Sequence, residues 1–344
     1  MKIDLKNKKI LGFGEIMMRL TAPSKSTFMQ INNLDLHFGG SEANVITNLS
    51  ILGNKTKYLT KLPDNDLGKM VTMNLNKYGV NTDDIVIGGE RLGTYYVELG
   101  TALRTSKVIY DRKYSSFFDT KIEEYDFDKI LNDVGLIHIS GITPALNDNT
   151  RYLTLEILKE CKKRNIIVSY DSNYRAKLWS IDDASEFLKE VLPYVDIAFL
   201  GYLDLTNMLK YRIDENLLSE NFDIQLKSLY QKLVSEYPNI NCIASTKRDI
   251  ISSDENKLKG YVYFDGELYT SKQYEFNIVD RIGSGDAFTS GILHCLFDSM
   301  SLNETVEFGT ACGVLNHTLY GDISTISKND ISNFVRDGIT RIKR

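Results

Sequence analysis

Short apolar segments alternate with longer segments of helical periodicity along most of this chain. Residues 10–17 and 56–62 are typical of buried strands, whereas 41–52 and 66–78 are typical of helices and are each followed by glycine. More strand-like segments follow at 135–139, 166–170, 195–200 and 241–245. Such alternation places parallel strands side by side with crossover helices between them. The sequence therefore predicts an α/β fold, a three-layer α/β/α sandwich with a mostly parallel sheet.

Two segments depart from this alternation. Residues 93–113 contain two runs of alternating β-type pattern with a polar turn between them, which predicts an antiparallel hairpin that stands off the main sheet. Residues 260–271 predict a second hairpin, which turns at Asp265 and Gly266, a dipeptide typical of tight turns.

The composition excludes several classes of protein. The 344 residues carry a formal net charge of -5, whereas a nucleic-acid partner usually requires a basic face. The apolar run near the N-terminus is short and is interrupted by Glu15, so we expect neither a signal peptide nor a membrane span. The four cysteines are far apart, which predicts reduced thiols in a cytoplasmic enzyme: Cys161, Cys242, Cys295 and Cys312.

The strongest chemical signal is a glycine-rich turn before a helix. Gly283, Ser284, Gly285 and Asp286 follow a strand-like segment, and glycines at such a position let backbone N–H groups converge on an anion. Asp286 would then lie beside the bound phosphate as a catalytic base. The alternative is that Asp286 only caps the helix. No Gly-Lys-Ser/Thr follows, so this is not a Walker A loop.

Two segments carry a resemblance to a known family. Residues 280–288, which read DRIGSGDAF, resemble the D-T-x-G-A-G-D-x-F signature of the ribokinase (PfkB) family of carbohydrate kinases. Residues 39–44, which read GGSEAN, resemble its other signature, G-G-x-x-x-N followed by L-G. The resemblance implies one ribokinase-like domain over 1–344, with a β-lid formed by parts of 17–38 and 93–113. It also implies ATP and Mg²⁺ as cofactors, with Asp286 as the catalytic base and Gly283, Ser284 and Gly285 around the phosphoryl group.

Within the family, the chain most resembles the kinases of 2-keto-3-deoxygluconate. Residues 39–45 match their G-G-A-E-A-N-V pattern, and residues 171–179, DSNYRAKLW, resemble their D-x-N-x-R-x-x-L-W stretch. The resemblance implies phosphorylation of O6, the primary hydroxyl of this sugar acid. The substrate-binding residues that it implies are Gly39, Gly40, Asn44, Tyr96, Tyr110, Arg112, Arg175 and Asp286.

Most of these residues also have a physical reason to be there. Gly39 and Gly40 permit close approach of the backbone to a ligand, although they also fit a simple turn into a helix. The planar guanidinium groups of Arg112 and Arg175 suit a carboxylate. Tyr96 on the hairpin could cover a sugar ring, but core packing is the commoner role of a tyrosine.

The nucleotide-binding segments depart from the family pattern. The N-x-x-E motif, which helps to hold magnesium, is replaced by Gly201 and Asp204, so Asp204 would contact hydrated Mg²⁺ or cap a helix. The T-x-G-x-x-G loop has lost both glycines. The nucleotide contacts that remain by resemblance are Thr246, Lys247, Arg248, Gly283, Gly285 and Asn316.

Two other functions stay open at this point. The chain could phosphorylate fructose, another ketose or a different deoxy sugar acid. It could also be a catalytically silent sugar-binding relative, although Asp286 with both flanking glycines argues against silence. The resemblance further implies a homodimer formed through the lid, with no nucleic-acid or membrane partner.

Overall fold

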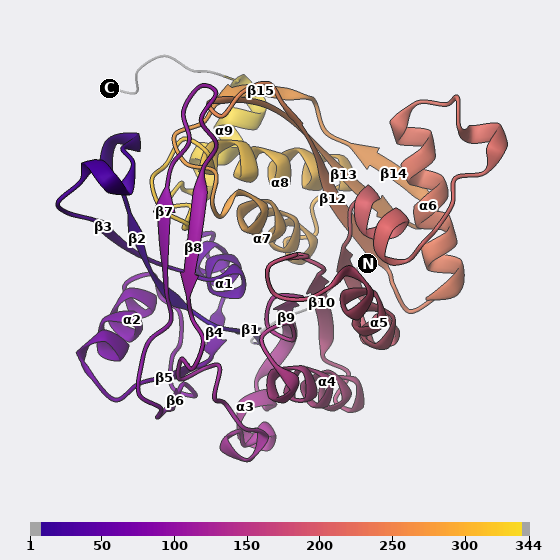
Figure 1. Ribbon diagram of the computed structural model, residues 1–344. Helices are drawn as coiled ribbons and strands as arrows, with labels where there is room; N and C mark the ends of the chain where they lie inside the picture. Colours follow the sequence, from indigo (N-terminus) through magenta and orange to yellow (C-terminus); the bar gives the residue numbers. More distant parts are fainter. Residues whose placement is uncertain (1–7, 339–344) are drawn as a thin grey trace.

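A large twisted sheet runs through the centre of the molecule in the computed structural model, which describes residues 8–338 (Figure 1). Within these residues the strand order is β14-β13-β12-β11-β10-β9-β1-β4, and β15 pairs with β13. The strands from β4 to β12 pair in parallel, whereas β13, β14 and β15 are antiparallel. The bounds are β1 Lys9–Phe13, β4 Thr56–Leu59, β9 Val134–Ser140, β10 Ile167–Asp171, β11 Ile197–Phe199, β12 Cys242–Ile250, β13 Glu255–Phe264, β14 Glu267–Thr270 and β15 Tyr274–Asn277.

Helices cover both faces of this sheet, because successive strand residues point to opposite sides. Ala198 packs into the core beneath α4, α5 and α6, whereas its neighbours Ile197 and Phe199 pack into the core beneath α1, α2 and α7. The helices are α1 Ser41–Ile51, α2 Asp66–Lys77, α3 Phe127–Leu131, α4 Asp148–Lys163, α5 Ile181–Val191, α6 Phe222–Glu236, α7 Ser284–Phe297, α8 Leu302–Asn316 and α9 Lys328–Asp337. The predicted three-layer fold class is confirmed.

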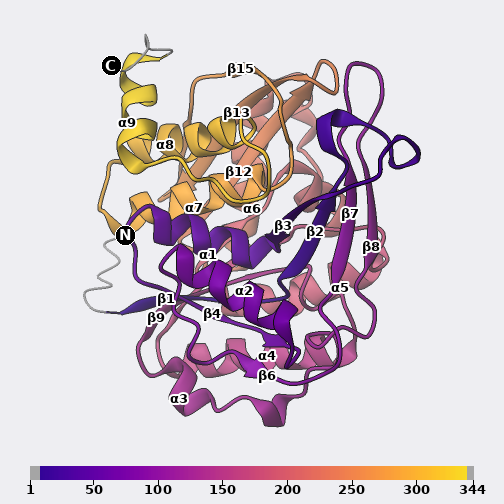
Figure 2. The same ribbon diagram turned by 90° about the vertical axis from the view of Figure 1, so that its left-hand side faces the viewer.

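A small second sheet stands over the carboxyl ends of the central strands (Figure 2). Its order is β3-β2-β7-β8, with β2 Met17–Thr21, β3 Asp35–Gly39, β7 Thr94–Glu98 and β8 Lys107–Asp111. The strands β7 and β8 form an antiparallel hairpin, as the alternating pattern of 93–113 predicts, and β2 joins β7 in parallel. We call these four strands the lid sheet. The strands β5 (Lys61–Leu62) and β6 (Val86–Ile87) form a third, two-stranded sheet.

Three predicted strands have different bounds in the structure. The segment 10–17 is not one strand, because β1 ends at Phe13 and β2 begins at Met17 in the lid sheet. The segment 56–62 is divided between β4 and β5. The strand predicted over 241–245 continues to Ile250, and each residue from Cys242 to Ile250 is paired with β13. The segment 246–250 contains no glycine, the residue that most readily adopts the positive φ values of a tight turn, so the extended strand continues.

The structure also bears on the expectations for membrane spans and for the cysteines. No helix within residues 8–338 is long and apolar enough to cross a membrane. The four cysteines are buried and unpaired, as predicted. Residues 1–7, which belong to the N-terminal segment in which we expect no signal peptide, lie outside the described residues.

Candidate active site

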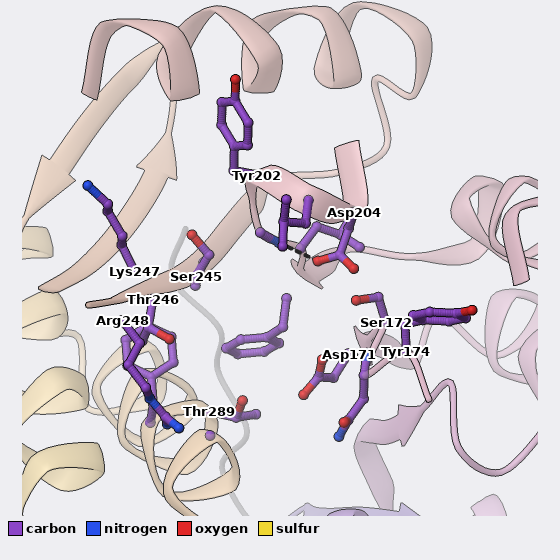
Figure 3. A pocket seen from close by; sticks show the side chains of 18 of the residues that line it. Asp171, Ser172, Tyr174, Tyr202, Asp204, Ser245, Thr246, Lys247, Arg248 and Thr289 are labelled. Carbon is purple, nitrogen blue, oxygen red and sulfur yellow. Dashed lines mark hydrogen bonds between the residues drawn. The ribbon is translucent and has the colours of Figure 1, made fainter. Parts of the chain in front are cut away.

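Two cavities meet at the carboxyl ends of the central strands, where ligands bind in open α/β sheets. The strand-end cavity has a volume of about 590 Å³ and lies beside β11, β12 and α7 (Figure 3). The lid cavity has a volume of about 480 Å³ and lies between the lid sheet, α1 and α7. The residues that line both cavities are Asp171, Asn173, Arg248 and Gly285. This shared boundary is the place where a group could pass from one cavity to the other.

Asp286 lies on the lid-cavity side of this boundary, in the first turn of α7, and is buried. Its carboxylate accepts hydrogen bonds from Ser41 Oγ at 2.9 Å and from Asn44 Nδ2 at 2.7 Å, both on α1. The N-cap of α7 is Gly283, so the capping alternative does not account for Asp286. Burial raises the pKa of Asp286 to about 6, against the lowering effect of these two hydrogen bonds. A carboxylate with such a pKa can accept a proton near neutral pH.

The start of α7 is open to an anion. No side chain within residues 8–338 caps the helix, so its first N–H groups remain available to a ligand. Gly283 has a φ of +82°, and a Cβ there would lie 2.0 Å from the carbonyl oxygen of Asp322. A Cβ on Gly285 would have no other atom within 4 Å. Gly283 is therefore required by the backbone, whereas Gly285 leaves free space where the two cavities meet.

The predicted sugar-binding residues gather in the lid cavity with a few exceptions. Those that line it are Gly40, Asn44, Tyr110, Arg112, Arg175 and Asp286. Gly39 does not line it; instead, a Cβ there would lie 2.2 Å from Oδ2 of Asp322, so packing within the protein requires this glycine. Tyr96 packs edge-on against Phe28. We correct the lid tyrosine to Tyr95, which lines the cavity because neighbouring strand residues face opposite sides.

The cations of the lid cavity differ in their partners. Arg112 is buried and donates two hydrogen bonds to Oε2 of Glu15, one of them from Nε at 2.7 Å. Its charge is therefore largely balanced within the protein. Arg175 is exposed on the cavity wall, and Nη2 of Arg281 is buried with no hydrogen-bond partner among the described residues. An anionic ligand would satisfy these two guanidinium groups best.

Four of the predicted nucleotide contacts, Thr246, Lys247, Arg248 and Gly285, line the strand-end cavity, whereas Gly283 lines only the lid cavity. The first three belong to β12, and Figure 3 shows the Arg248 side chain extending toward α7. Nζ of Lys247 lies 4.6 Å from the centre of the Phe222 ring. Asn316 is fully buried and donates to the carbonyl oxygen of Ile282, so it supports the turn before α7 and lines neither cavity.

Carboxylates face the strand-end cavity from the opposite side. Asp204 begins a π-helical turn, Asp204–Met208, and accepts the N–H of Gly201 at 2.7 Å. Asp171 lies at the end of β10, and its pKa is raised to about 8 by burial and then by the charges of Asp286 and Asp204. A hydrated Mg²⁺ would relieve this repulsion, so the residues fit such an ion. No group of three direct metal ligands exists within residues 8–338.

Sequence reasoning assigned no role to several polar residues that shape the site. Asp322 accepts a hydrogen bond from Tyr95 Oη at 2.5 Å and another from Arg19 Nη1 at 2.6 Å. Asp280 pairs with the other terminal nitrogen of Arg19, which is fully buried on β2. Glu15 holds Arg112, as described above. Their signal in the sequence was weak, because a single acidic residue does not reveal a partner that lies 97 to 303 positions away.

Comparison with known proteins identifies the family. The profile described as pfkB family carbohydrate kinase matches residues 7–329. This chain belongs to the pfkB family of carbohydrate kinases. The prediction drawn from the two signature segments is therefore confirmed, and so is the enzyme class, a carbohydrate kinase.

Several known proteins are similar to this chain over nearly their whole length. A 2-dehydro-3-deoxygalactonokinase of Haloferax volcanii is 29% identical over 336 residues, which cover 98% of this chain and 99% of the relative. The structure of a PfkB family carbohydrate kinase from Listeria grayi is 38% identical with a TM-score of 0.90, covering 96% of this chain and 100% of that one. The structure of a 2-dehydro-3-deoxygluconokinase from Thermotoga maritima is 33% identical with a TM-score of 0.90, covering 96% and 99%.

Proposed function

We propose that this carbohydrate kinase transfers the γ-phosphoryl group of ATP to O6 of 2-keto-3-deoxygluconate, also called 2-dehydro-3-deoxygluconate. The observation that carries the proposal is the buried carboxylate of Asp286, which stands at an uncapped helix start where the two cavities meet. The arginines of the lid cavity favour an acidic sugar. The names of the relatives from Haloferax volcanii and Thermotoga maritima support the same class of substrate.

Each cavity would hold one substrate. The lid cavity would take the sugar acid, with Tyr95 and Tyr110 beside the ring and Asn44 and Gly40 near its hydroxyl groups. Arg175 and Arg281 would bind the carboxylate, since their guanidinium forks match its geometry. The strand-end cavity would take ATP, with Thr246 and Lys247 near the phosphates.

The chemistry follows from charge and position. Asp286 would accept the proton of the primary hydroxyl as its oxygen attacks the γ-phosphorus. The N–H groups at the start of α7 would stabilise the charge on the transferring group, as preorganised donors do. Magnesium supplies further charge compensation for ATP, and Asp171 and Asp204 would hold its water shell on their side of the cavity.

An alternative substrate has a specific observation in its favour. Glu15 already balances Arg112, so the lid cavity has fewer unpaired cations than the resemblance implied. A neutral ketose such as fructose would need fewer unpaired cations in the cavity, because it has no carboxylate. Three other arginines that line the lid cavity, Arg175, Arg248 and Arg281, have no carboxylate partner within residues 8–338, however, and a neutral sugar would not neutralise their charge. We therefore favour the acid.

We further propose the setting in which the enzyme works. The whole chain would act as one kinase domain in the cytoplasm, with the lid sheet closing over the sugar. Leu36 and Ile109 are exposed apolar residues on the lid strands, at 43% and 54% exposure, and would contribute to a homodimer through this sheet. Sedimentation velocity of the protein and of an Ile109→Lys variant would test the dimer.

The proposed reaction can be tested by product analysis. ADP release should be measured with 2-keto-3-deoxygluconate, its C4 epimer 2-keto-3-deoxygalactonate, and fructose. The phosphorylated carbon should then be assigned by phosphorus–proton correlation NMR. We expect a sugar acid to have a kcat/KM at least ~10³-fold above that of fructose, with phosphate on O6. Preferred use of fructose would replace the acid by a ketose. Sugar binding without any ADP release would identify a silent relative.

A further inference from the structure

Arg248 is the positively charged side chain that lines both cavities. Lys247, its neighbour on β12, lines the strand-end cavity, whereas Arg175 lines the lid cavity. Arg248 Nη2 donates to Oγ of Ser284 at 2.9 Å, which holds the guanidinium at the first residue of α7. Figure 3 shows it near Thr289 of the same helix and across the cavity from Asp171. The guanidinium thus lies where a group must pass between the cavities.

The charge of Arg248 has no anion to balance it. No carboxylate of residues 8–338 lies within ion-pair distance of its guanidinium, and the side chain is partly buried. Burial and the nearby charge of Arg281 lower the pKa of Arg248 to about 10. Two partly buried guanidinium groups that line one cavity without a carboxylate partner repel each other, and an anion bound in the cavity would relieve this repulsion. The arrangement therefore points to an anionic group at the boundary of the cavities.

The segment that carries Arg248 lacks the two glycines of the T-x-G-x-x-G loop. In the T-x-G-x-x-G pattern, glycines allow a loop whose backbone N–H groups can approach phosphates. In this chain the same residues continue β12, with Arg248 opposite Leu258 of β13. The pairing with β13 from Thr246 to Ile250 keeps this segment extended, so it does not form a loop whose successive N–H groups converge on phosphates. A side-chain cation is then the available source of positive charge on this wall.

We propose that Arg248 is a catalytic residue that stabilises the phosphoryl group during its transfer between the cavities. The proposal rests on the kinase reaction proposed above and deepens it. The bond between the γ-phosphorus and the bridging oxygen breaks, and its electron pair stays with ADP. A bond forms between the sugar hydroxyl oxygen and phosphorus, and the hydroxyl proton passes to Asp286. The guanidinium of Arg248 donates to the oxygens of the phosphoryl group while it is bound to neither partner.

Steady-state kinetics of Arg248→Gln, Arg248→Lys and Lys247→Gln separate this role from simple nucleotide binding. We expect Arg248→Gln to lower kcat by about 10³-fold, within the range for an arginine that stabilises the phosphoryl group, and to change KM for ATP by less than about threefold. Arg248→Lys should recover only part of the rate, because it keeps the charge but loses the planar fork. Lys247→Gln removes the neighbouring charge, which lines only the strand-end cavity, and should raise KM for ATP by a larger factor than it lowers kcat.

Binding of ADP with aluminium fluoride gives a second readout that requires no sugar. This planar anion resembles the transferring group, and calorimetry should show that it increases the affinity of the protein for ADP by at least about tenfold. Arg248→Gln should bind ADP normally and lose this increase. If the sugar assignment is wrong, this result still holds, so the two proposals fail separately.

Two results would overturn the role of Arg248. One is a raised KM for ATP with normal kcat in Arg248→Gln, which would make it a nucleotide contact. The other is an undiminished effect of aluminium fluoride in that variant. If Arg248→Gln does not fold, Arg248→Lys decides by the same two measurements, and normal kcat in that variant would contradict the need for a guanidinium fork.

Discussion

Nδ2 of Asn44 donates a hydrogen bond of 2.7 Å to Oδ2 of Asp286 and so joins two helices 242 positions apart in the chain. Ser41 donates to the other oxygen of the same carboxylate at 2.9 Å. Both hydrogen bonds favour the charged form and lower the pKa of Asp286, which burial has raised to about 6. The two residues of α1 thus lower the pH above which Asp286 is ionised and able to accept a proton.

Removing one of these donors should shift the pH profile. In Ser41→Ala, the pKa of Asp286 should rise, because the charged form loses a hydrogen bond while burial is unchanged. The acidic limb of kcat/KM should therefore move from near pH 6 to higher pH, with most activity retained at pH 8.5. Ser50→Ala, on the same helix but bonded to the carbonyl of Tyr78, is the control. An acidic limb that stays in place would exclude Asp286 as its origin.

Asp171 should make stability depend on pH. Its pKa is about 8 in the folded protein and 3.8 ordinarily, so the folded state keeps a proton that the unfolded state has released. The stabilisation is present below about pH 4 and is lost as the pH rises toward 8. Melting temperatures should be measured at pH 5, 7 and 9. The melting temperature of Asp171→Asn should rise relative to that of the unmodified protein as the pH increases. The same pH dependence of the melting temperature in both proteins would contradict this. Asp119→Asn, which changes an exposed aspartate, is the control.

The two glycines before Asp286 should behave differently. Gly283→Ala places a Cβ against the backbone of Asp322 at a φ of +82°, so it should cost about 1–3 kcal/mol of stability and lower the melting temperature. Gly285→Val faces open space and should fold normally, but its side chain would occupy the place of the phosphoryl group and abolish turnover. Parallel melting and activity measurements test the pair. Equal thermal loss in both would make the two glycines purely structural.

Substitutions of the two arginines predicted to bind the acid, Arg112 and Arg175, should have different effects on stability. Arg175→Lys should raise KM for the sugar acid about tenfold or more and leave the melting temperature unchanged, because Arg175 is exposed and the fork is lost. Arg112→Lys should lower the melting temperature as well, since it disrupts the buried pair with Glu15. Any weak activity on fructose serves as the internal control. Normal KM values in both variants would remove these residues from carboxylate binding.

Much of the fold and part of the site followed from the sequence for physical reasons. The strands and helices were predictable because their apolar patterns are local, and Gly283 to Asp286 combine turn chemistry with a helix start. Long-range pairs were not predictable: nothing near Arg112 in the chain reveals Glu15, and nothing near Arg19 reveals Asp280. Tyr95 rather than the predicted Tyr96 lines the lid cavity, because a shift of one residue on a strand reverses the direction of the side chain.

Substitution of Asp286 by Asn tests the central claim most directly, because it keeps the size of the side chain but removes the proton acceptor. Single-turnover rates with ATP and the preferred sugar acid should fall by at least ~10²–10⁴-fold, the usual contribution of a general base. Calorimetry should show that the sugar acid still binds, and the melting temperature should confirm that the variant is folded. Near-normal turnover in a folded Asp286→Asn variant would contradict the role of Asp286 as the base.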